Sequence, residues 1–316
     1  MESLLLEIGE ILNLAILAGT AILIATLGEI FTERSGILNL GVEGMMIMGA
    51  ITAYVITYLT HNPWFGIIMA MIIGTLFSLI HAFISITLKG NQTVSGLALT
   101  MLGLGISAVI GKFYDESIVS VTVKEYSFSP ISIPFLSDIP VIGPALFISD
   151  PIVYIGIISS IFLWYFLFKT KYGLTIRAVG ENPIVADTLG INVYLIRYLC
   201  VMLGGSLAGL AGAHLTIAYT SSWIEGITRG KGWIAVGLTI FALWNPLRAL
   251  IGSYLFGLID ILQYRLQPYG IAPSILAMFP YIFTIVALLI GTSKRMKKRK
   301  KSPAALGVPY IRGEKE

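Results

Sequence analysis

Polar side chains inside apolar segments are the first candidates for chemistry in this chain, because burying a polar group is costly unless it has a partner or a task. Glu43 lies seven residues beyond Gly36, the start of a long apolar segment. Asn39 precedes Glu43 by four residues, so a helix running on from Gly36 would place both on one face. Gln92 and Ser95 open another apolar segment. Two interpretations stay open: these residues line a polar path, or they form hydrogen bonds between buried helices and cap a helix start.

The residue types that support catalysis or metal binding do not gather in one motif. The three histidines, at positions 61, 81 and 214, lie in separate segments without metal-ligand spacing. The single Cys200 excludes a disulfide framework within the chain. Segment 105–113 resembles a phosphate-binding loop only loosely, because it has one residue too many and Phe113 where Ser or Thr would hold the metal. We therefore expect no enzyme activity, no ATP hydrolysis by this chain, no cofactor and no metal site.

The composition is that of a membrane protein. Of 316 residues, 56% are hydrophobic and only 12% are charged, whereas a soluble domain has about 25% charged residues. Apolar stretches of roughly 17–25 residues, the length that a membrane-spanning helix needs, recur along the chain. The sequence therefore predicts an all-α, polytopic membrane protein with about 8–10 transmembrane helices.

Nine segments are candidates for these helices. Seven have full length, and two shorter ones would form a tight hairpin or a re-entrant pair. The full-length candidates are Ile11–Leu27, Gly36–Leu59, Trp64–Ile86, Val94–Gly111, Pro151–Phe168, Tyr198–Ala218 and Ile271–Ile290. The short pair is Gly232–Trp244 and Ala249–Leu262, joined by Asn245-Pro246-Leu247-Arg248.

The basic residues predict the orientation. With nine passes and an inside C-terminus, 16 of the 21 Lys and Arg residues fall inside, in agreement with the positive-inside rule. These are Arg34, Lys89, Arg248, four in loop 169–197 and nine in the tail. Loop 169–197 and the basic tail 294–316 are then cytoplasmic, residues 1–293 form the transmembrane domain, and the proline-rich loop 114–150 is a structured extracellular cap. The basic cluster at 294–301 directly follows an apolar segment, a position that favours membrane lipid over nucleic acid as its partner.

The cytoplasmic loop contains a short capped helix. Asn182 is a preferred N-cap, Pro183 suits the first helical position, and Gly190 suits the left-handed residue after the end. The helix Pro183–Leu189 would make about two turns. The residues that it presents include Ile184, Val185, Asp187, Thr188 and Leu189. An apolar helix held outside the membrane is typical of a segment that docks into a groove on a soluble partner.

One longer motif carries a family resemblance. Residues 33–46 read Glu-Arg-Ser-Gly-Ile-Leu-Asn-Leu-Gly-Val-Glu-Gly-Met-Met. This motif closely resembles a signature of the membrane permease subunits of ABC importers, in the superfamily of branched-chain amino-acid, ribose and simple-sugar permeases. Segments 91–99, 177–193 and 303–310 also match. The resemblance covers most of the chain from residue 20 onward and is closest to the nucleoside permeases.

The resemblance implies what the chain works with. It implies a second, homologous permease subunit in a heterodimer, cytoplasmic ATP-binding subunits, and an extracytoplasmic substrate-binding lipoprotein, all at the cell membrane. It also implies that helix 183–190 couples the permease to the ATPase, and that the substrate is a nucleoside, with a simple sugar such as ribose as the second choice. A stand-alone secondary carrier, with Glu43 and Asp260 as its central acids, and a membrane enzyme are the competing classes.

Overall fold

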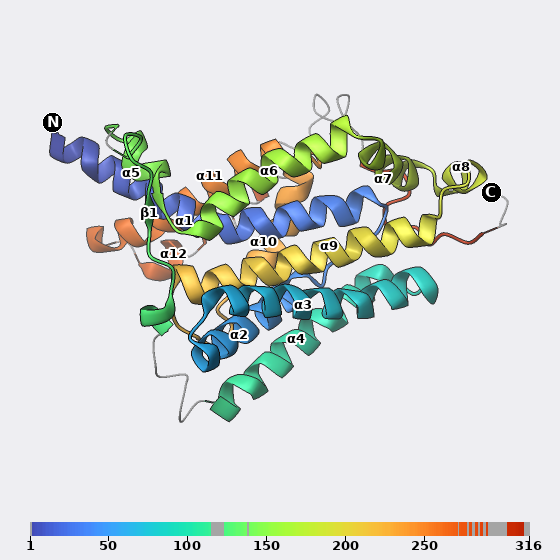
Figure 1. Cartoon of the computed structure of the whole chain (residues 1–316), viewed down its shortest axis with the longest axis horizontal. Helices are drawn as coiled ribbons and strands as arrows, with labels where there is room; N and C mark the ends of the chain where they lie inside the picture. The colour runs from blue at the N-terminus through green and yellow to red at the C-terminus, as the bar shows by residue number, and fades with distance from the viewer. Residues whose placement is uncertain are drawn as a thin grey trace.

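Long helices form the body of the chain, as Figure 1 shows for the computed structural model. The structure describes residues 2–114, 123–137, 139–270, 272–276, 278–279, 282–283, 285–286, 289 and 302–312. The long helices are α1 (Glu2–Arg34), α2 (Val42–Thr60), α3 (Pro63–Ala82), α4 (Gln92–Tyr114), α6 (Pro151–Lys169), α9 (Val193–His214) and α11 (Pro246–Leu266). The short helices are α5 (Ile142–Leu146), α7 (Lys171–Glu181), α8 (Pro183–Thr188), α10 (Lys231–Phe241) and α12 (Pro273–Leu276). The π-helical turns η1 (Phe83–Thr87) and η4 (Leu215–Tyr219) extend α3 and α9, η3 (Val123–Tyr126) and η5 (Gln267–Tyr269) are 3-10 turns, and β1 (Ile131–Ser132) pairs antiparallel with β2 (Ile148–Ser149).

The helices confirm the predicted all-helical, multi-pass membrane protein. Among the described residues, six helical stretches are long and apolar enough to cross a membrane: α1, α2, α3 with η1, α4, α6, and α9 with η4. The short pair predicted at 232–262 is uneven, because α10 is about 16 Å long and α11 about 31 Å at 1.5 Å per residue. The structure describes 12 of the 20 residues in the predicted span Ile271–Ile290, whereas the basic cluster at 294–301 lies entirely outside the described residues.

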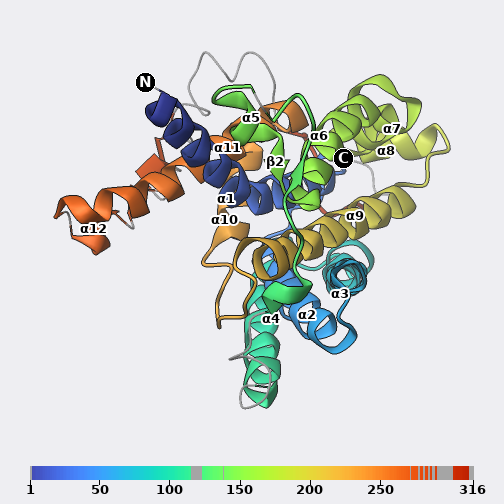
Figure 2. The ribbon, with the colours of Figure 1, turned by 60° about the vertical axis from the view of Figure 1, so that its left-hand side comes forward.

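Helix α9 lies at the centre of the helix group. It packs against α1, α2 and α3, while α1 also packs along α10 and α11. Figures 1 and 2 show the same grouping, with α4 and α12 projecting from it in different directions. The apolar windows of α1 and α2 are 72% and 78% buried, whereas those of α3, α4 and α6 are at most 39% buried. The outer faces of α3, α4 and α6 are therefore the apolar surfaces that suit contact with lipid.

The two ends of this helix group carry different elements. Helices α7 and α8 and residues 302–312 lie at one end, called here the α8 end, and α5, β1 and β2 lie at the other, called the α5 end (Figure 1). The described part of loop 114–150 contains η3, β1, α5 and β2, and its role as an extracellular cap stays a prediction. This part of the loop is tied to α1, because Asn13 Nδ2 donates a hydrogen bond of 2.8 Å to the carbonyl of Ile148.

Two helices, α2 and α10, begin inside the protein. Helix α2 follows an irregular segment at 36–41, and α10 follows a loop at 220–230. Each leads into an Asn-Pro turn, where the Asn62 side chain caps α3 and the Asn245 side chain caps α11. The second turn lies at the α8 end, where Arg34 at the end of α1 donates to its carbonyls. The first turn lies toward the α5 end (Figure 1). The two helix pairs are therefore arranged in opposite directions, as in an inverted repeat.

Candidate functional site: an interrupted-helix junction and the cavity beside it

The irregular segment before α2 is buried, and side chains satisfy its backbone. The N–H of Leu38 donates to Gln92 Oε1 at 2.7 Å, and the carbonyl of Leu38 accepts from His81 Nε2 at 3.1 Å. The other ring nitrogen of His81 lies 3.1 Å from Ser95 Oγ. Inside a membrane, non-helical backbone is tolerated only where other groups replace water as hydrogen-bond partners. Gln92, together with Ser95 through His81, therefore stabilises the non-helical backbone of segment 37–41 within the protein.

Asn39 belongs to the same irregular segment. Its N–H donates to Glu29 Oε1 of α1 at 3.2 Å, and its side-chain oxygen accepts from the N–H of Gly41 at 2.9 Å. The prediction that Asn39 and Glu43 share one face of a helix is wrong, because α2 begins only at Val42. The sequence pattern missed this start, since the partners that replace the helical hydrogen bonds come from distant parts of the chain.

Glu43, on the first turn of α2, caps the N-terminus of α10. Its carboxylate accepts from Thr228 Oγ1 at 2.5 Å, from the N–H of Gly230 at 2.8 Å and from the N–H of Gly232 at 2.6 Å. The side chain is only 4% exposed. A carboxylate in this position satisfies free N–H groups at the helix start and opposes the positive end of the helix dipole. A Cβ atom at Gly232 would lie 2.6 Å from Glu43 Cα, so the two helix starts are in direct contact.

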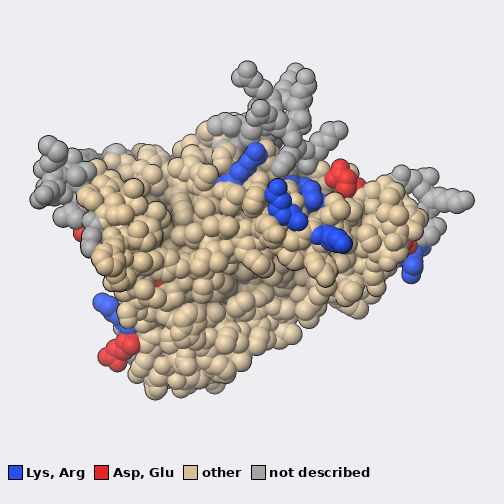
Figure 3. All heavy atoms as spheres, turned by 45° about the horizontal axis from the view of Figure 1, so that its top comes forward, with Lys and Arg blue, Asp and Glu red and all other residues tan. Residues whose placement is uncertain are grey.

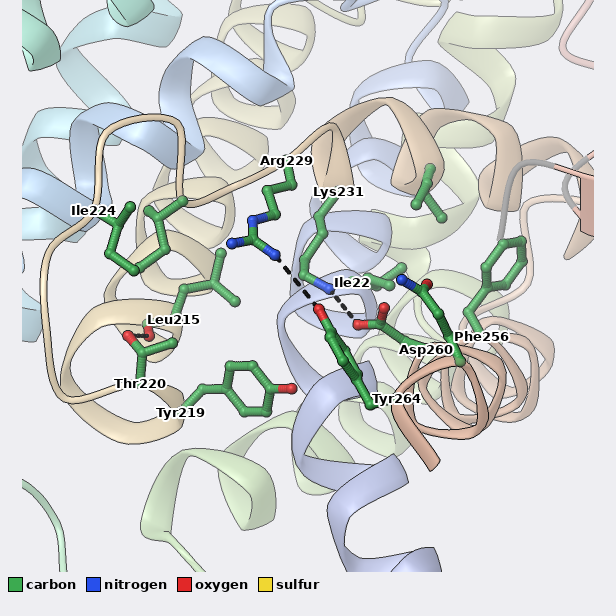
Figure 4. Close-up of a pocket in the computed structure, with 13 residues that line it drawn as sticks. Ile22, Leu215, Tyr219, Thr220, Ile224, Arg229, Lys231, Phe256, Asp260 and Tyr264 are labelled. Carbon is green, nitrogen blue, oxygen red and sulfur yellow. Dashed lines mark hydrogen bonds and ion pairs between the residues drawn. The ribbon is translucent and has the colours of Figure 1, made fainter. Parts of the chain in front are cut away.

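A cavity of about 300 Å³ lies beside this junction, between α1, η4, loop 220–230, α10 and α11. Figure 4 shows the residues that line it. The wall combines aromatic rings, hydrogen-bonding groups and charges. The aromatic residues are Tyr219, Phe256 and Tyr264, and the polar residues include Arg229, Lys231, Asp260 and Gln263.

The charged groups of the cavity are partly paired with one another. Lys231 Nζ lies 2.9 Å from Asp260 Oδ2, and Arg229 Nη1 lies 3.4 Å from the hydroxyl of Tyr264, which Figure 4 marks with dashed lines. Asp260 of α11 is therefore paired with the first residue of α10. Ionisable side chains between membrane helices normally face a protein interior or a water-filled cavity. Aromatic faces with a few placed polar groups are the usual lining of a site for a small organic molecule.

The junction and the cavity share loop 220–230. Glu43 itself does not line the cavity, but it binds Gly230, which lies between the cavity residues Arg229 and Lys231. Its contribution to the cavity is therefore to position this part of the loop. Sequence reasoning named Asp260 but missed the other cavity residues, because it counted Arg229 and Lys231 among the five basic residues on the outer side. The available signal was the pair of basic residues around Gly230, followed by an acidic residue within a later apolar helix.

The short helix at the α8 end has the caps that the sequence predicts. Asn182 Oδ1 accepts from the N–H of Val185 at 3.0 Å, and Gly190 adopts a φ of +82° just after the helix. The helix itself spans Pro183–Thr188, with Leu189 as its C-cap. The side chains of Val185 and Leu189 point outward, at 52% and 75% exposure. They form an apolar patch at the tip of the molecule, called here the α8 patch.

Three further side chains of the α8 region have partners within the chain. Ile184 packs on the inner side of the helix, with the cluster around Ala186 and Tyr310. Asp187 Oδ2 accepts from Arg312 Nε at 3.1 Å. Thr188 Oγ1 donates to the carbonyl of Val185 at 2.8 Å. The outward face of α8 is therefore narrower than the predicted docking face.

Comparison of the sequence with known proteins identifies relatives among transport proteins. The family model described as "Branched-chain amino acid transport system / permease component" matches residues 11–291. A putative glucose ABC transporter permease of Haloferax volcanii is 40% identical, over 96% of this chain and 97% of its own length. A guanosine ABC transporter permease of Bacillus subtilis is 38% identical, over 98% of this chain and 100% of its own. A nucleoside ABC transporter permease of Lactococcus lactis is 36% identical, over 93% and 94%.

Among solved structures, PsaBC from Streptococcus pneumoniae, in complex with Fab, aligns with a TM-score of 0.46 and 15% identity over 90% of this chain and 93% of its own. The family match begins within α1 and spans both the interrupted-helix junction and the cavity. The chain thus belongs to the permease-component family of branched-chain amino acid transport systems.

Proposed function

We propose that this chain forms the translocation path for a nucleoside in an ABC importer of the cell membrane. The observation that carries the proposal is the cavity with aromatic and charged walls between the helices of this membrane protein. A cavity of this kind offers a hydrophilic solute partners that the membrane does not. The guanosine and nucleoside permeases among the relatives support the same substrate class.

The chemistry of the cavity favours a ring-shaped, uncharged solute. A nucleobase has a flat face for Tyr219 or Tyr264, and a ribose has hydroxyl groups that hydrogen-bond to carboxylate and amide side chains such as Asp260 and Gln263. An amino acid would need a carboxylate for its ammonium group, whereas Asp260 is paired with Lys231. A simple sugar is the second candidate, because it uses the same hydroxyl contacts and one relative is a putative glucose permease.

ATP-binding subunits would bind at the α8 end and drive the transport cycle. The α8 patch offers Val185 and Leu189 to an apolar groove on such a partner. Basic residues support a cytoplasmic location for this end. In the face shown in Figure 3, most visible Lys and Arg side chains lie on the right-hand half, which holds α7 and α8 in Figure 1. A second homologous permease subunit and a binding lipoprotein would complete the importer.

The predicted path residues would act mainly by shaping this path. Glu43 fixes the loop that carries Arg229 and Lys231, whereas Asn39, Gln92 and Ser95 keep segment 37–41 in place. In many membrane transporters, discontinuous helices of this kind form the substrate site near the middle of the membrane.

The cavity assignment is tested by uptake of labelled guanosine into proteoliposomes that contain the full importer. Tyr219→Ala removes one stacking face, and we expect uptake to fall about tenfold, the scale of a base–aromatic contact. Tyr219→Phe keeps the ring and should retain most of the uptake. Tyr165→Ala on the exposed face of α6 is the matched control. Equal uptake by Tyr219→Ala and Tyr165→Ala would contradict the cavity assignment. Competition by unlabelled guanosine, ribose and glucose then separates a nucleoside importer from a sugar importer.

A further inference from the structure

The C-terminal segment returns to the α8 end and binds two elements there. The N–H of Ala305 donates to the carbonyl of Gly180 in α7 at 3.0 Å, and the N–H of Gly307 donates to the carbonyl of Gly36 at 3.1 Å. Gly36 is the first residue of the irregular segment that leads into α2. The C-terminal segment is therefore joined by backbone hydrogen bonds both to the helix before α8 and to the approach to α2.

The same segment also packs against the inner side of α8. Tyr310 is 5% exposed and packs in a cluster with Val179, Ala186 and Val193, its ring centroid 5.5 Å from that of Tyr194. A buried aromatic ring contributes a large apolar contact area, so Tyr310 anchors this short irregular segment. The exposed ion pair between α8 and the end of the segment contributes little free energy. It mainly fixes the position of the end of the segment beside α8.

A buried guanidinium joins this segment to the end of α1. Arg197 of α9 is 1% exposed, and its Nε donates to the carbonyl of Ser35 at 3.2 Å. Its Nη1 donates to the carbonyl of Val308 at 3.5 Å. One side chain thus ties the C-terminal segment and the residue just before Gly36 to the central helix.

We propose that residues 303–312 form a strap that transmits displacement of α8 to segment 36–41. Segment 36–41 leads into α2, whose Glu43 holds the loop beside the cavity. Chains of packed side chains and hydrogen bonds can carry coupling between distant sites. Helix α8, the strap and Gly36 form such a chain of contacts from the α8 patch toward the cavity. The strap rests on the proposed function, since it gives α8 the role of a coupling helix. Helix α7 contacts the end of α1 as well, so the strap strengthens coupling and is not its sole carrier.

The test uses the full importer in proteoliposomes and measures substrate transported per ATP hydrolysed. Tyr310→Ala removes the anchor of the strap, and we expect this ratio to fall at least roughly fivefold, the lower end of usual coupling strengths. ATP-binding subunits should still co-purify, because the α8 patch is unchanged. Tyr310→Phe keeps the ring and should restore the ratio. Val308→Ala is the matched control, since that side chain is 53% exposed in the same segment.

A charge swap checks the strap if Tyr310→Ala fails to fold. Asp187→Arg and Arg312→Asp each place like charges between α8 and the strap, so each should lower the ratio, though less than Tyr310→Ala does, and the double variant should recover it. A wild-type ratio in Tyr310→Ala, with the segment shown by proteolysis to be released, would overturn the strap. Loss of the ATP-binding subunits from Tyr310→Ala would also overturn it, because the segment would then be a docking surface. If the unmodified chain fails to bind ATP-binding subunits, the proposed function is wrong, whatever the strap variants do.

Discussion

Single substitutions at the junction of α2 and α10 test whether Glu43 positions loop 220–230 beside the cavity. Glu43→Gln keeps the size of the side chain but replaces one carboxylate oxygen with an NH₂ group, which cannot accept from the N–H groups that Glu43 binds. Hydrogen bonds to charged groups contribute about 1.5–3 kcal/mol each. We expect the protein to assemble normally and guanosine uptake to fall about tenfold, a loss of about 1.4 kcal/mol, because loop 220–230 shifts beside the cavity.

The matched change on the other side of the junction is Gly232→Ala. The added Cβ would lie 2.6 Å from Glu43 Cα, so one helix start must move. Both variants should lower uptake, and Glu43→Gln should leave the yield of assembled importer unchanged, as measured by size-exclusion chromatography. If Glu43→Gln transports at the wild-type rate while Glu43→Leu fails to assemble, Glu43 serves stability and not the path.

The sequence identified the unusual residues of this region better than it identified their partners. Glu43 and Gln92 stand out because they are polar groups in apolar segments, and both are buried and hydrogen-bonded. Their partners, Gly232 and Leu38, lie 189 and 54 residues away along the chain. Local spacing contains no information on such distant contacts, so the shared helical face predicted for Asn39 and Glu43 was wrong.

At the scale of elements, the structure shows which side chains of α8 face outward, so docking of the ATPase can be tested at those positions. Val185→Asp and Leu189→Asp place a charge on the outward face, where an apolar groove of the ATPase would bury it at a cost of several kcal/mol. We expect ATP-binding subunits to be lost on co-purification and substrate-stimulated hydrolysis to vanish. Membrane insertion should stay normal, because α8 lies outside the membrane spans.

Controls on the same element separate docking from folding. Ile184→Val is a mild change on the inner face of α8 and should leave docking intact. Wild-type co-purification and hydrolysis by both Asp variants would show that α8 is not the coupling element.

A different element-scale prediction concerns the end of α8. Gly190 adopts a φ of +82°, and an added Cβ would meet no atom of another residue within 4 Å, its chain neighbours aside. Gly190→Val would therefore strain the backbone without any steric clash, since β-branched residues strongly disfavour positive φ. We expect weaker coupling and a lower melting temperature of the isolated importer, measured by thermal unfolding. Gly190→Asn, which tolerates this backbone conformation, should behave nearly like the wild type.

Element ends were predictable where local chemistry sets them. Asn182, Pro183 and Gly190 define the limits of α8 through caps that act within a few residues, and the structure has these caps. Helix α10 was different, because its start depends on Glu43 from another helix. Apolar length alone predicted the first residue of α10 to within one position. It could not predict that this first residue lies inside the protein.

The whole molecule divides into parts that follow from composition and parts that follow from tertiary contacts. Composition and apolar length predicted a multi-pass helical protein, which the six membrane-length helices among the described residues confirm. The orientation predicted from the positive charges stays a prediction. The C-terminal strap was not predictable in this way. Its motif 303–310 was noticed only as a family match, because a polar, proline-containing segment without periodicity gives no sign of what it packs against.

The last prediction applies to the whole molecule and separates an importer subunit from a stand-alone carrier. A carrier would need an ion-coupling site, yet the central acid Glu43 is engaged by three hydrogen bonds and Asp260 is paired with Lys231. We expect the purified chain in vesicles to show no accumulation of guanosine under a proton or sodium gradient. Adding the second permease subunit, the ATP-binding subunits, the binding protein and ATP should start uptake. Gradient-driven accumulation by the chain alone, abolished by Asp260→Asn, would instead identify a secondary carrier whose coupling site is the cavity.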